Sequence, residues 1–183
     1  MKVVLINGSG GSGKDTLVNL ITTYLRFEFE IRNISTIDKV KKIAKEMGWD
    51  GNKDEAGRQF LADLKNVWTK YNNGANKETM NWIVAYHADE MISAKEFLVF
   101  VHCREAESLK WFEEELDKRK IDCCSILVKR DNIQLFQNNS DKFVENFNYD
   151  MTITNNGSLE DLDKISKELS EKLYHWEVKD INE

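Results

Sequence analysis

The 183-residue sequence contains no proline, which excludes proline-rich linkers and polyproline II recognition segments. It has only three cysteines, and two of them, Cys123 and Cys124, are adjacent in an apolar run. We therefore expect reduced, buried thiols rather than a disulfide framework. Long apolar runs are also missing, since stretches such as 97–101 are far shorter than the roughly 20 residues of a membrane-spanning helix. These absences predict a soluble, cytoplasmic protein with no membrane partner.

Positive charge is scarce as well, with 26 Lys and Arg residues against 32 Asp and Glu residues, a net charge of -6. This balance argues against a broad nucleic-acid surface but leaves room for a local anion site. The length, with 41% hydrophobic residues and no internal repeat, favours one domain over residues 1–183. Nothing in the pattern indicates how many copies of the chain associate.

Short apolar runs alternate with longer amphipathic segments, a pattern typical of a parallel sheet covered by helices on both faces. We predict strands at 3–6, 97–101, 123–128 and 151–154, and a further strand, second in the chain, that ends near residue 37. Helices are predicted at 14–26, 38–47, 54–71, 77–92 and 105–117, with a last one after a capping box of Ser158 and Asp161. The helix at 77–92 is expected to bury Met80, Ile83, Val84, Ala88 and Met91, and the last ten residues to form a poorly packed tail. The predicted fold class is α/β, a three-layer α/β/α sandwich around a mainly parallel five-stranded sheet.

Two segments interrupt this alternation. Residues 39–93 place up to three helices between two strands, and residues 131–148 are rich in Asn and Gln with little apolar periodicity. In parallel-sheet proteins, such insertions follow the carboxyl ends of strands, where ligands bind. We therefore expect a helical insertion on the substrate side after the second strand and a short lid after the fourth.

Residues 8–16, GSGGSGKDT, match the pattern G-x-x-x-x-G-K directly after an apolar strand and before an amphipathic helix. In that context the loop aims its backbone N–H groups at one point beside the positive end of the helix, which suits a polyphosphate. Lys14 would bridge the outer phosphates and assist catalysis. The alternative is a flexible Gly–Ser turn, but such a turn requires neither this lysine nor this position. We expect ATP contacts from Gly8, Gly10, Gly11, Ser12, Gly13, Lys14, Asp15 and Thr16.

Asp15 stands where Ser or Thr is usual in this motif, and Thr16 follows one place later. A carboxylate does not replace the hydroxyl in the same way, so we expect Asp15 to hold Mg²⁺ through water and Thr16 to contact an inner phosphate. The alternative is that Asp15 is an exposed carboxylate stabilised by the first helical turn.

The sequence GSGKDT after the first strand resembles the P-loop of phage-type deoxynucleoside monophosphate kinases and animal phosphomevalonate kinase, within the NMP-kinase-like P-loop proteins. Residues 38–41 stand at their short motif after the second strand, and Arg58 lies near their acceptor-binding Arg. His102-Cys103-Arg104 stands where they have Asp-x-Arg, so His102 departs from the family and is not expected to take an acidic role. Residues 149–157 resemble their last strand and the loop beside the adenine, which implies a nucleotide contact from Asn155.

Phosphoryl transfer needs positive charge around the transferred group and an acceptor held in line. Arg58, Arg104 and Arg130 are expected to converge on one anionic pocket, Arg104 and Arg130 in catalysis and Arg58 with Arg104 in acceptor binding. The alternatives are a solvated helix residue for Arg58 and a polar strand end for Arg130. Asp38 would bind an acceptor hydroxyl or take its proton, or would simply cap the helix after it.

Lys41, one turn after Asp38, would reach an acceptor phosphate or would only complement the surface. Four tryptophans on helical apolar faces are expected mainly as core anchors, with one or two free to stack on a base: Trp49, Trp68, Trp82 and Trp111. The predicted function is an ATP- and Mg²⁺-dependent kinase acting on a phosphorylated acceptor, most simply a (deoxy)nucleoside monophosphate. The alternatives are a kinase for a non-nucleotide phosphate and a nucleotide-binding module without kinase activity.

Overall fold

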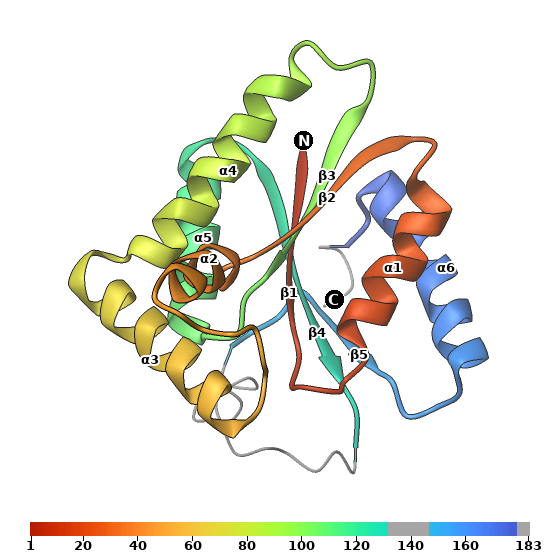
Figure 1. Cartoon of the computed structure of the whole chain (residues 1–183). Coiled ribbons are helices and arrows are strands. Elements are labelled where there is room, and N and C mark those ends of the chain that lie inside the picture. Colours follow the sequence, from red (N-terminus) through yellow and green to blue (C-terminus); the bar gives the residue numbers. More distant parts are fainter. Residues whose placement is uncertain (132–146, 179–183) are drawn as a thin grey trace.

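The computed structural model describes residues 1–131 and 147–178, which fold around one five-stranded sheet (Figure 1). All neighbouring strands are parallel, in the order β2-β3-β1-β4-β5. The strands are β1 (Lys2–Asn7), β2 (Phe29–Ser35), β3 (Glu96–His102), β4 (Asp122–Lys129) and β5 (Met151–Thr154). The predicted parallel sheet is therefore confirmed, and β1 lies at its centre between β3 and β4.

Helices cover both faces of the sheet (Figure 1). One face packs against α1 (Lys14–Leu25) and α6 (Leu159–His175), and the other against α4 (Gly74–Glu90) and α5 (Ala106–Lys118). The remaining helices, α2 (Asp38–Glu46) and α3 (Glu55–Asn72), lie beside the carboxyl ends of the strands. This arrangement confirms the predicted three-layer sandwich and the helical insertion after the second strand.

Alternate residues of β1 enter two separate cores, which explains why the strand is apolar throughout. Val4 and Ile6 belong to the core under α1 and α6, whereas Val3 and Leu5 belong to the core under α4 and α5. A third, smaller cluster joins α2, α3 and α4 through the buried residues Val40, Ala44, Leu61 and Ala75. The four tryptophans predicted as core anchors are partly buried: Trp49 and Trp68 pack against this third cluster, and Trp82 and Trp111 pack against the α4–α5 core.

Two local predictions were wrong. Val84 and Ala88 of α4 and Met91, its C-cap, are exposed rather than buried, because the buried face of α4 lies one turn earlier and includes the polar residues Asn76 and Thr79. The last ten residues were predicted to form a poorly packed tail, but Val178, the last described residue, is fully buried. The segment after α6 is therefore packed against the sheet as far as the structure describes it.

Other predictions concern the cysteines, the membrane and the lid. Cys103, Cys123 and Cys124 are free and buried, as expected. Within residues 1–131 and 147–178, no helix combines the length and the hydropathy needed to cross a membrane. Residues 132–146 of the predicted lid lie outside the described residues.

Candidate active site

The loop between β1 and α1 has the backbone geometry of an anion-binding nest. Gly13, the N-cap of α1, has a φ of 92°, and no side chain among the described residues caps the first turn of this helix. A helix start of this kind suits an anion, because its first N–H groups have no acceptor within the helix. Close packing also requires glycine at residue 8, because an added Cβ would collide with the Ser12 side chain and the Val128 carbonyl oxygen.

Two buried asparagines hold this loop. Asn155, which follows β5, donates from Nδ2 to the Ser12 carbonyl at 2.8 Å. Asn7, the last residue of β1, accepts from the Gly8 N–H at 2.7 Å and donates to the Arg104 carbonyl at 3.0 Å. Asn155 thus holds the loop through its backbone. A direct contact of Asn155 with the nucleotide remains a prediction. Asn7 was missed because its partner Arg104 is far away in the sequence.

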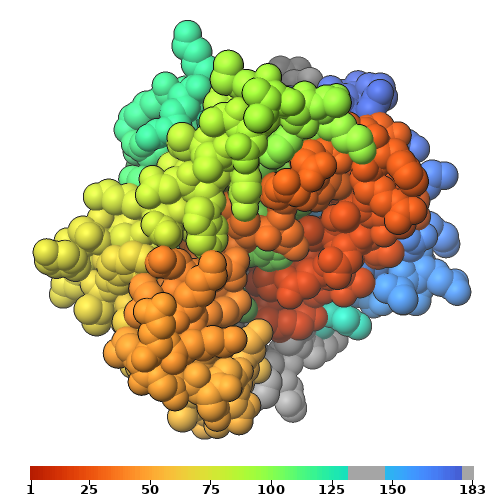
Figure 2. Space-filling view, turned by 45° about the horizontal axis from the view of Figure 1, so that its top comes forward, coloured from red at the N-terminus to blue at the C-terminus, as the bar shows by residue number. Residues whose placement is uncertain are grey.

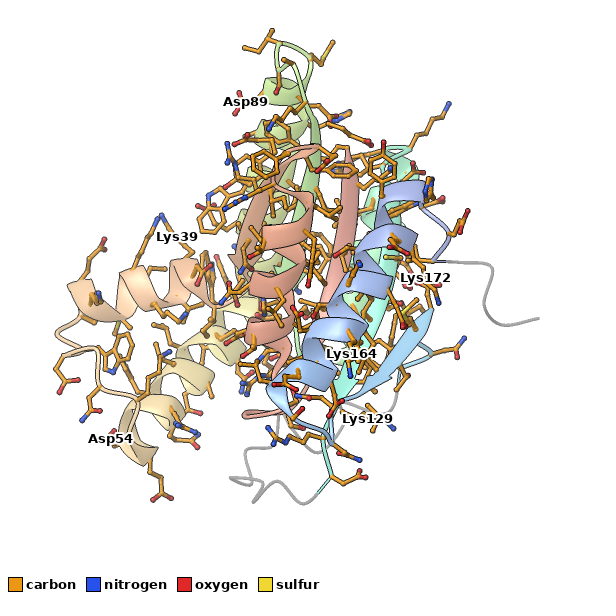
Figure 3. The ribbon with its side chains drawn as sticks, turned by 90° about the vertical axis from the view of Figure 1, so that its right-hand side faces the viewer. Lys39, Asp54, Asp89, Lys129, Lys164 and Lys172 are labelled. Carbon is orange, nitrogen blue, oxygen red and sulfur yellow. The ribbon has the colours of Figure 1, made fainter. Side chains whose placement is uncertain are left out.

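A cavity of about 630 Å³ opens beside the loop. Its wall combines the loop, the carboxyl ends of β2 and β3, and helices α2 and α3. The space-filling view shows the lobe that contains α2 beside the red N-terminal segment (Figure 2). From the side, Lys39 of α2 and Asp54 before α3 lie on the opposite side of the molecule from Lys164 and Lys172 of α6 (Figure 3). Because the strand ends line one side of the cavity and α2 and α3 line the other, the cavity lies between the sheet edge and the helical insertion.

The cavity wall is rich in positive charge although the whole chain carries a net charge of -6. Among the described residues, six basic side chains line it, against the three acidic side chains of Asp15, Asp38 and Glu105. The basic ones are Lys14, Lys41, Lys53, Arg58, Lys65 and Arg104. This is the local anion site that the overall composition left possible.

Three of the lysines are paired with the three acidic residues. Lys14 Nζ lies 3.5 Å from Asp15 Oδ1, and Lys41 Nζ lies 3.2 Å from Asp38 Oδ1. The third pair joins distant segments, with Lys65 Nζ 2.5 Å from Glu105 Oε2. An anionic ligand therefore enters a wall whose lysines are already positioned by carboxylates.

Asp38 has a different local role from the predicted helix cap. The N-cap of α2 is Ile37, and Asp38 is the first helical residue. Its Oδ2 accepts a hydrogen bond from the Ser35 N–H at 2.8 Å, which fixes the turn between β2 and α2. The carboxylate thereby holds Lys41 at the cavity wall.

The structure brings most of the predicted site residues together. Gly10, Gly11, Lys14, Asp15, Asp38, Lys41, Arg58 and Arg104 all line the cavity. Gly8, Ser12 and Gly13 shape the loop without lining the cavity, and Thr16 is exposed on α1. Arg130 is exposed and lies outside the lining, so the expected convergence holds for two of the three arginines.

Lys53, Lys65 and Glu105 also line the cavity but were not predicted. Lys65 had a weak signal, because it stands four residues after the buried Leu61 and so shares its face of α3. Its contact with Glu105, however, spans forty residues of sequence.

His102, at the end of β3, also lines the cavity, beside Asp15. Its Nδ1 is 3.4 Å from Asp15 Oδ1, and its side chain is 13% exposed. Burial lowers the pKa of His102 to about 4, against the opposing effect of Asp15, so the imidazole is neutral near pH 7. Its buried Nε2 has no hydrogen-bond partner among the described residues. The chain thus has a neutral ring where the resembling kinases have a carboxylate.

The carboxylate of Asp15 is 78% exposed beside Lys14. Among the described residues, no three His, Cys, Asp or Glu side chains cluster in a way that could hold a metal ion. Mg²⁺ is commonly held by one or two carboxylates together with substrate phosphates and water. Asp15 therefore fits Mg²⁺ that arrives with a nucleotide, with water or phosphate oxygens as the other ligands.

The strand order, the glycine loop after the central strand and the helices on both faces are those of the predicted P-loop NTPase fold. No family model matches the sequence, and no curated protein matches it. Among solved structures, the chain is similar to TT1252 from Thermus thermophilus, with 17% identity, 94% of this chain and 97% of that chain covered, and a TM-score of 0.51.

The chain is also similar to a kinase and to a designed protein. The Mycobacterium tuberculosis APS kinase CysC in complex with AMPPNP and APS shares 15% identity over 94% of this chain and 97% of that chain, with a TM-score of 0.47. A de novo designed protein with the P-loop NTPase fold shares 14% identity over 94% of this chain and 91% of that chain, with a TM-score of 0.38.

Proposed function

We propose that the chain is an ATP-dependent kinase that transfers the γ-phosphoryl group to a small phosphorylated acceptor. The observation that supports this is the shared cavity: the glycine loop and Lys14 form one wall, and Lys41, Arg58 and Arg104 line the rest. A triphosphate seated on the loop would end among these cations. Phosphoryl transfer depends mainly on such positioning and charge stabilisation.

Each residue has a distinct task in this proposal. The loop N–H groups and Lys14 hold the triphosphate, with Thr16 near an inner phosphate, and Arg104 stabilises the charge that develops on the transferred group. Mg²⁺, held through water by Asp15, supplies further neutralisation of the phosphates when bound. Lys41 and Arg58 bind the acceptor, and Asp38 orients Lys41 through their 3.2 Å contact.

The first acceptor class that we propose is a (deoxy)nucleoside monophosphate, in line with the resemblance in the loop and at Arg58. A second class, a non-nucleotide phosphate, is favoured by the composition of the cavity wall. No Phe, Tyr or Trp is among the described residues that line the cavity. Bases are commonly held by stacking on aromatic rings, whereas cations suffice for a compact anion.

An ADP-release assay tests the proposal and separates the two classes. Purified protein with ATP and Mg²⁺ is supplied with nucleoside monophosphates, sugar phosphates, phosphorylated carboxylates or no acceptor, and ATP binding is measured by calorimetry. A kinase shows turnover that depends on one acceptor class and is lost in Lys14→Ala but kept in Lys70→Ala, an exposed lysine of α3. Equal rates across the panel with ATP still bound would instead indicate a nucleotide-binding module without kinase activity.

A further inference from the structure

Resting on the proposed kinase function with a non-nucleotide phosphate as acceptor, we infer that Lys65, held by Thr36 and Glu105, is a second anion subsite. It lies in the acceptor part of the cavity, which is the part lined by α2, α3 and Arg104. The acceptor would then carry two anionic groups. One receives the phosphoryl group beside Lys14 and Arg104, and the other binds Lys65.

The first observation is the burial of Lys65. Its side chain is only 9% exposed, and lysine is almost never buried to this extent unless it is paired. It comes from α3, yet its Nζ donates to Thr36 Oγ1 at 3.0 Å and to Glu105 Oε2 at 2.5 Å. The insertion therefore places one ammonium group at the carboxyl edge of the sheet, between the ends of β2 and β3.

The second observation concerns the hydrogen-bonding capacity of this ammonium. A lysine side chain has three N–H donors, and Thr36 and Glu105 take two of them. Lys65 also lines the cavity, and no third acceptor for its ammonium is found among residues 1–131 and 147–178, so the third donor can reach a ligand there. Because both partners fix the ammonium before a ligand arrives, little side-chain entropy remains to be lost on binding.

The surroundings of Lys65 indicate the chemical class of the ligand. Arg58 and Lys53 line the same cavity from α3 and the loop before it, and Asn33 and Asn66 add polar amides. The described wall offers no aromatic ring for stacking. These groups suit a compact acceptor with two anionic ends, such as a bisphosphate or a phosphorylated carboxylate.

The probes are alkane bisphosphonates of increasing chain length, each compared with the alkyl monophosphonate of the same length. The protein is first saturated with Mg²⁺ and AMPPNP, so that the glycine loop is occupied, and binding is measured by calorimetry. We expect one bisphosphonate to bind at least about tenfold more tightly than its monophosphonate, since a charge-assisted hydrogen bond is added. Lys65→Met should remove this gain, whereas Lys70→Met, on the same helix but outside the cavity, should keep it.

Glu105→Gln distinguishes an anion subsite from a purely structural ion pair. The Glu105 side chain makes no capping hydrogen bond to α5, so its carboxylate acts mainly on Lys65. Removing its charge frees the ammonium for a ligand, and bisphosphonate affinity should rise severalfold while Lys65→Met lowers it. A structural pair would instead lower the affinity in both variants.

The outcomes keep the two proposals apart. Failure to bind AMPPNP would overturn the proposed kinase function itself. Normal AMPPNP binding with equal affinities for paired bisphosphonates and monophosphonates, or a weaker complex in Glu105→Gln, would overturn only the subsite. If Lys65→Met fails to fold, two other variants still decide the question. Glu105→Gln should raise the bisphosphonate affinity, whereas Arg58→Ala should lower the affinity for both probes.

Discussion

The two parts of the candidate site are built in different ways. The proposed nucleotide part is one run of nine residues, 8–16, whose glycines and helix start create the nest directly. The proposed acceptor part collects Asp38 and Lys41 from α2, Arg58 and Lys65 from α3, and Arg104 from the loop after β3. The first part therefore depends on local backbone geometry, and the second on how the insertion packs.

The ion pairs follow the same division. Lys14 and Asp15 are neighbours in sequence, whereas Lys65 and Glu105 meet only because α3 lies against the edge of the sheet. The third hydrophobic cluster, which joins α2, α3 and α4, holds that packing in place. Substitutions in one part should therefore change nucleotide binding and acceptor binding separately.

The largest effect is expected for Lys14→Ala in the nucleotide part. Removing a charge that acts on the transferred phosphoryl group should lower acceptor-dependent turnover by about 10²–10³-fold. The fold should survive, since the Nζ of Lys14 lies 3.5 Å from the exposed Asp15 carboxylate rather than in a core. ADP release measures the turnover, and circular dichroism measures whether the fold is preserved. Wild-type turnover in this variant would contradict the role proposed for Lys14.

Gly13→Ala tests whether the loop depends on its backbone geometry. The residue has a φ of 92°, and an added Cβ would collide with the Asn155 side chain that holds the loop. We expect a loss of about 1–3 kcal/mol in the free energy of unfolding, together with weaker ATP binding. Gly10→Ala is the matched control for stability, because a Cβ there meets nothing within 4 Å. Equal melting temperatures for the two variants would show that the loop tolerates side chains at residue 13.

Arg104→Ala addresses the junction of the two parts. We expect kcat/KM for the acceptor to fall at least about tenfold, since a charge-assisted contact with a phosphate is lost. The Asn7 hydrogen bond goes to the Arg104 backbone carbonyl, so it survives this substitution. Arg119→Ala, on an exposed arginine after α5, serves as the control. A rate near that of the wild type would place Arg104 outside the reaction.

His102→Asp restores the residue type of the resembling kinases at this junction. The new carboxylate would stand near Asp15, since His102 Nδ1 now lies 3.4 Å from Asp15 Oδ1. Two carboxylates beside a triphosphate repel it, and we expect ATP affinity to fall about fivefold at neutral pH. His102→Asn keeps the site neutral and should retain the affinity. Tighter ATP binding by His102→Asp would show that a carboxylate pair belongs in this site.

The fold was predictable because its strands are apolar runs buried on both faces. The predicted strand at 151–154 matches β5, and β1, β3 and β4 each extend one residue beyond the prediction at both ends. The buried face of α4 was misplaced because it includes two polar residues that form internal hydrogen bonds: Asn76 Nδ2 donates to Ser108 Oγ, and Thr79 Oγ1 donates to the Ala75 carbonyl. Hydropathy alone does not detect a buried polar face of this kind.

Site residues could be predicted where they are consecutive, as in the glycine loop, or lie soon after a strand end, as Asp38 and Arg104 do. Lys41 and Arg58 stand in segments that resemble known kinases, and all of these residues reach the cavity or its loop. Lys65 and Asn7 act through partners such as Glu105 and Arg104, which are distant in sequence. Such contacts exist only after the insertion has packed, so periodicity on one helix does not reveal them.

The smallest effect is expected for Gly74→Ala, which perturbs the acceptor part from a distance. Gly74 begins α4, and an added Cβ would collide with the indole of Trp68 in α3. Overpacking of this kind usually costs about 1–3 kcal/mol of stability, and shifting α3 should raise the acceptor KM about two- to threefold while AMPPNP affinity stays constant. In the double variant with Trp68→Leu, the smaller side chain should relieve the collision and restore part of the lost stability. If Gly74→Ala weakened AMPPNP binding as much as acceptor binding, the two parts of the site would be coupled through the insertion rather than separable.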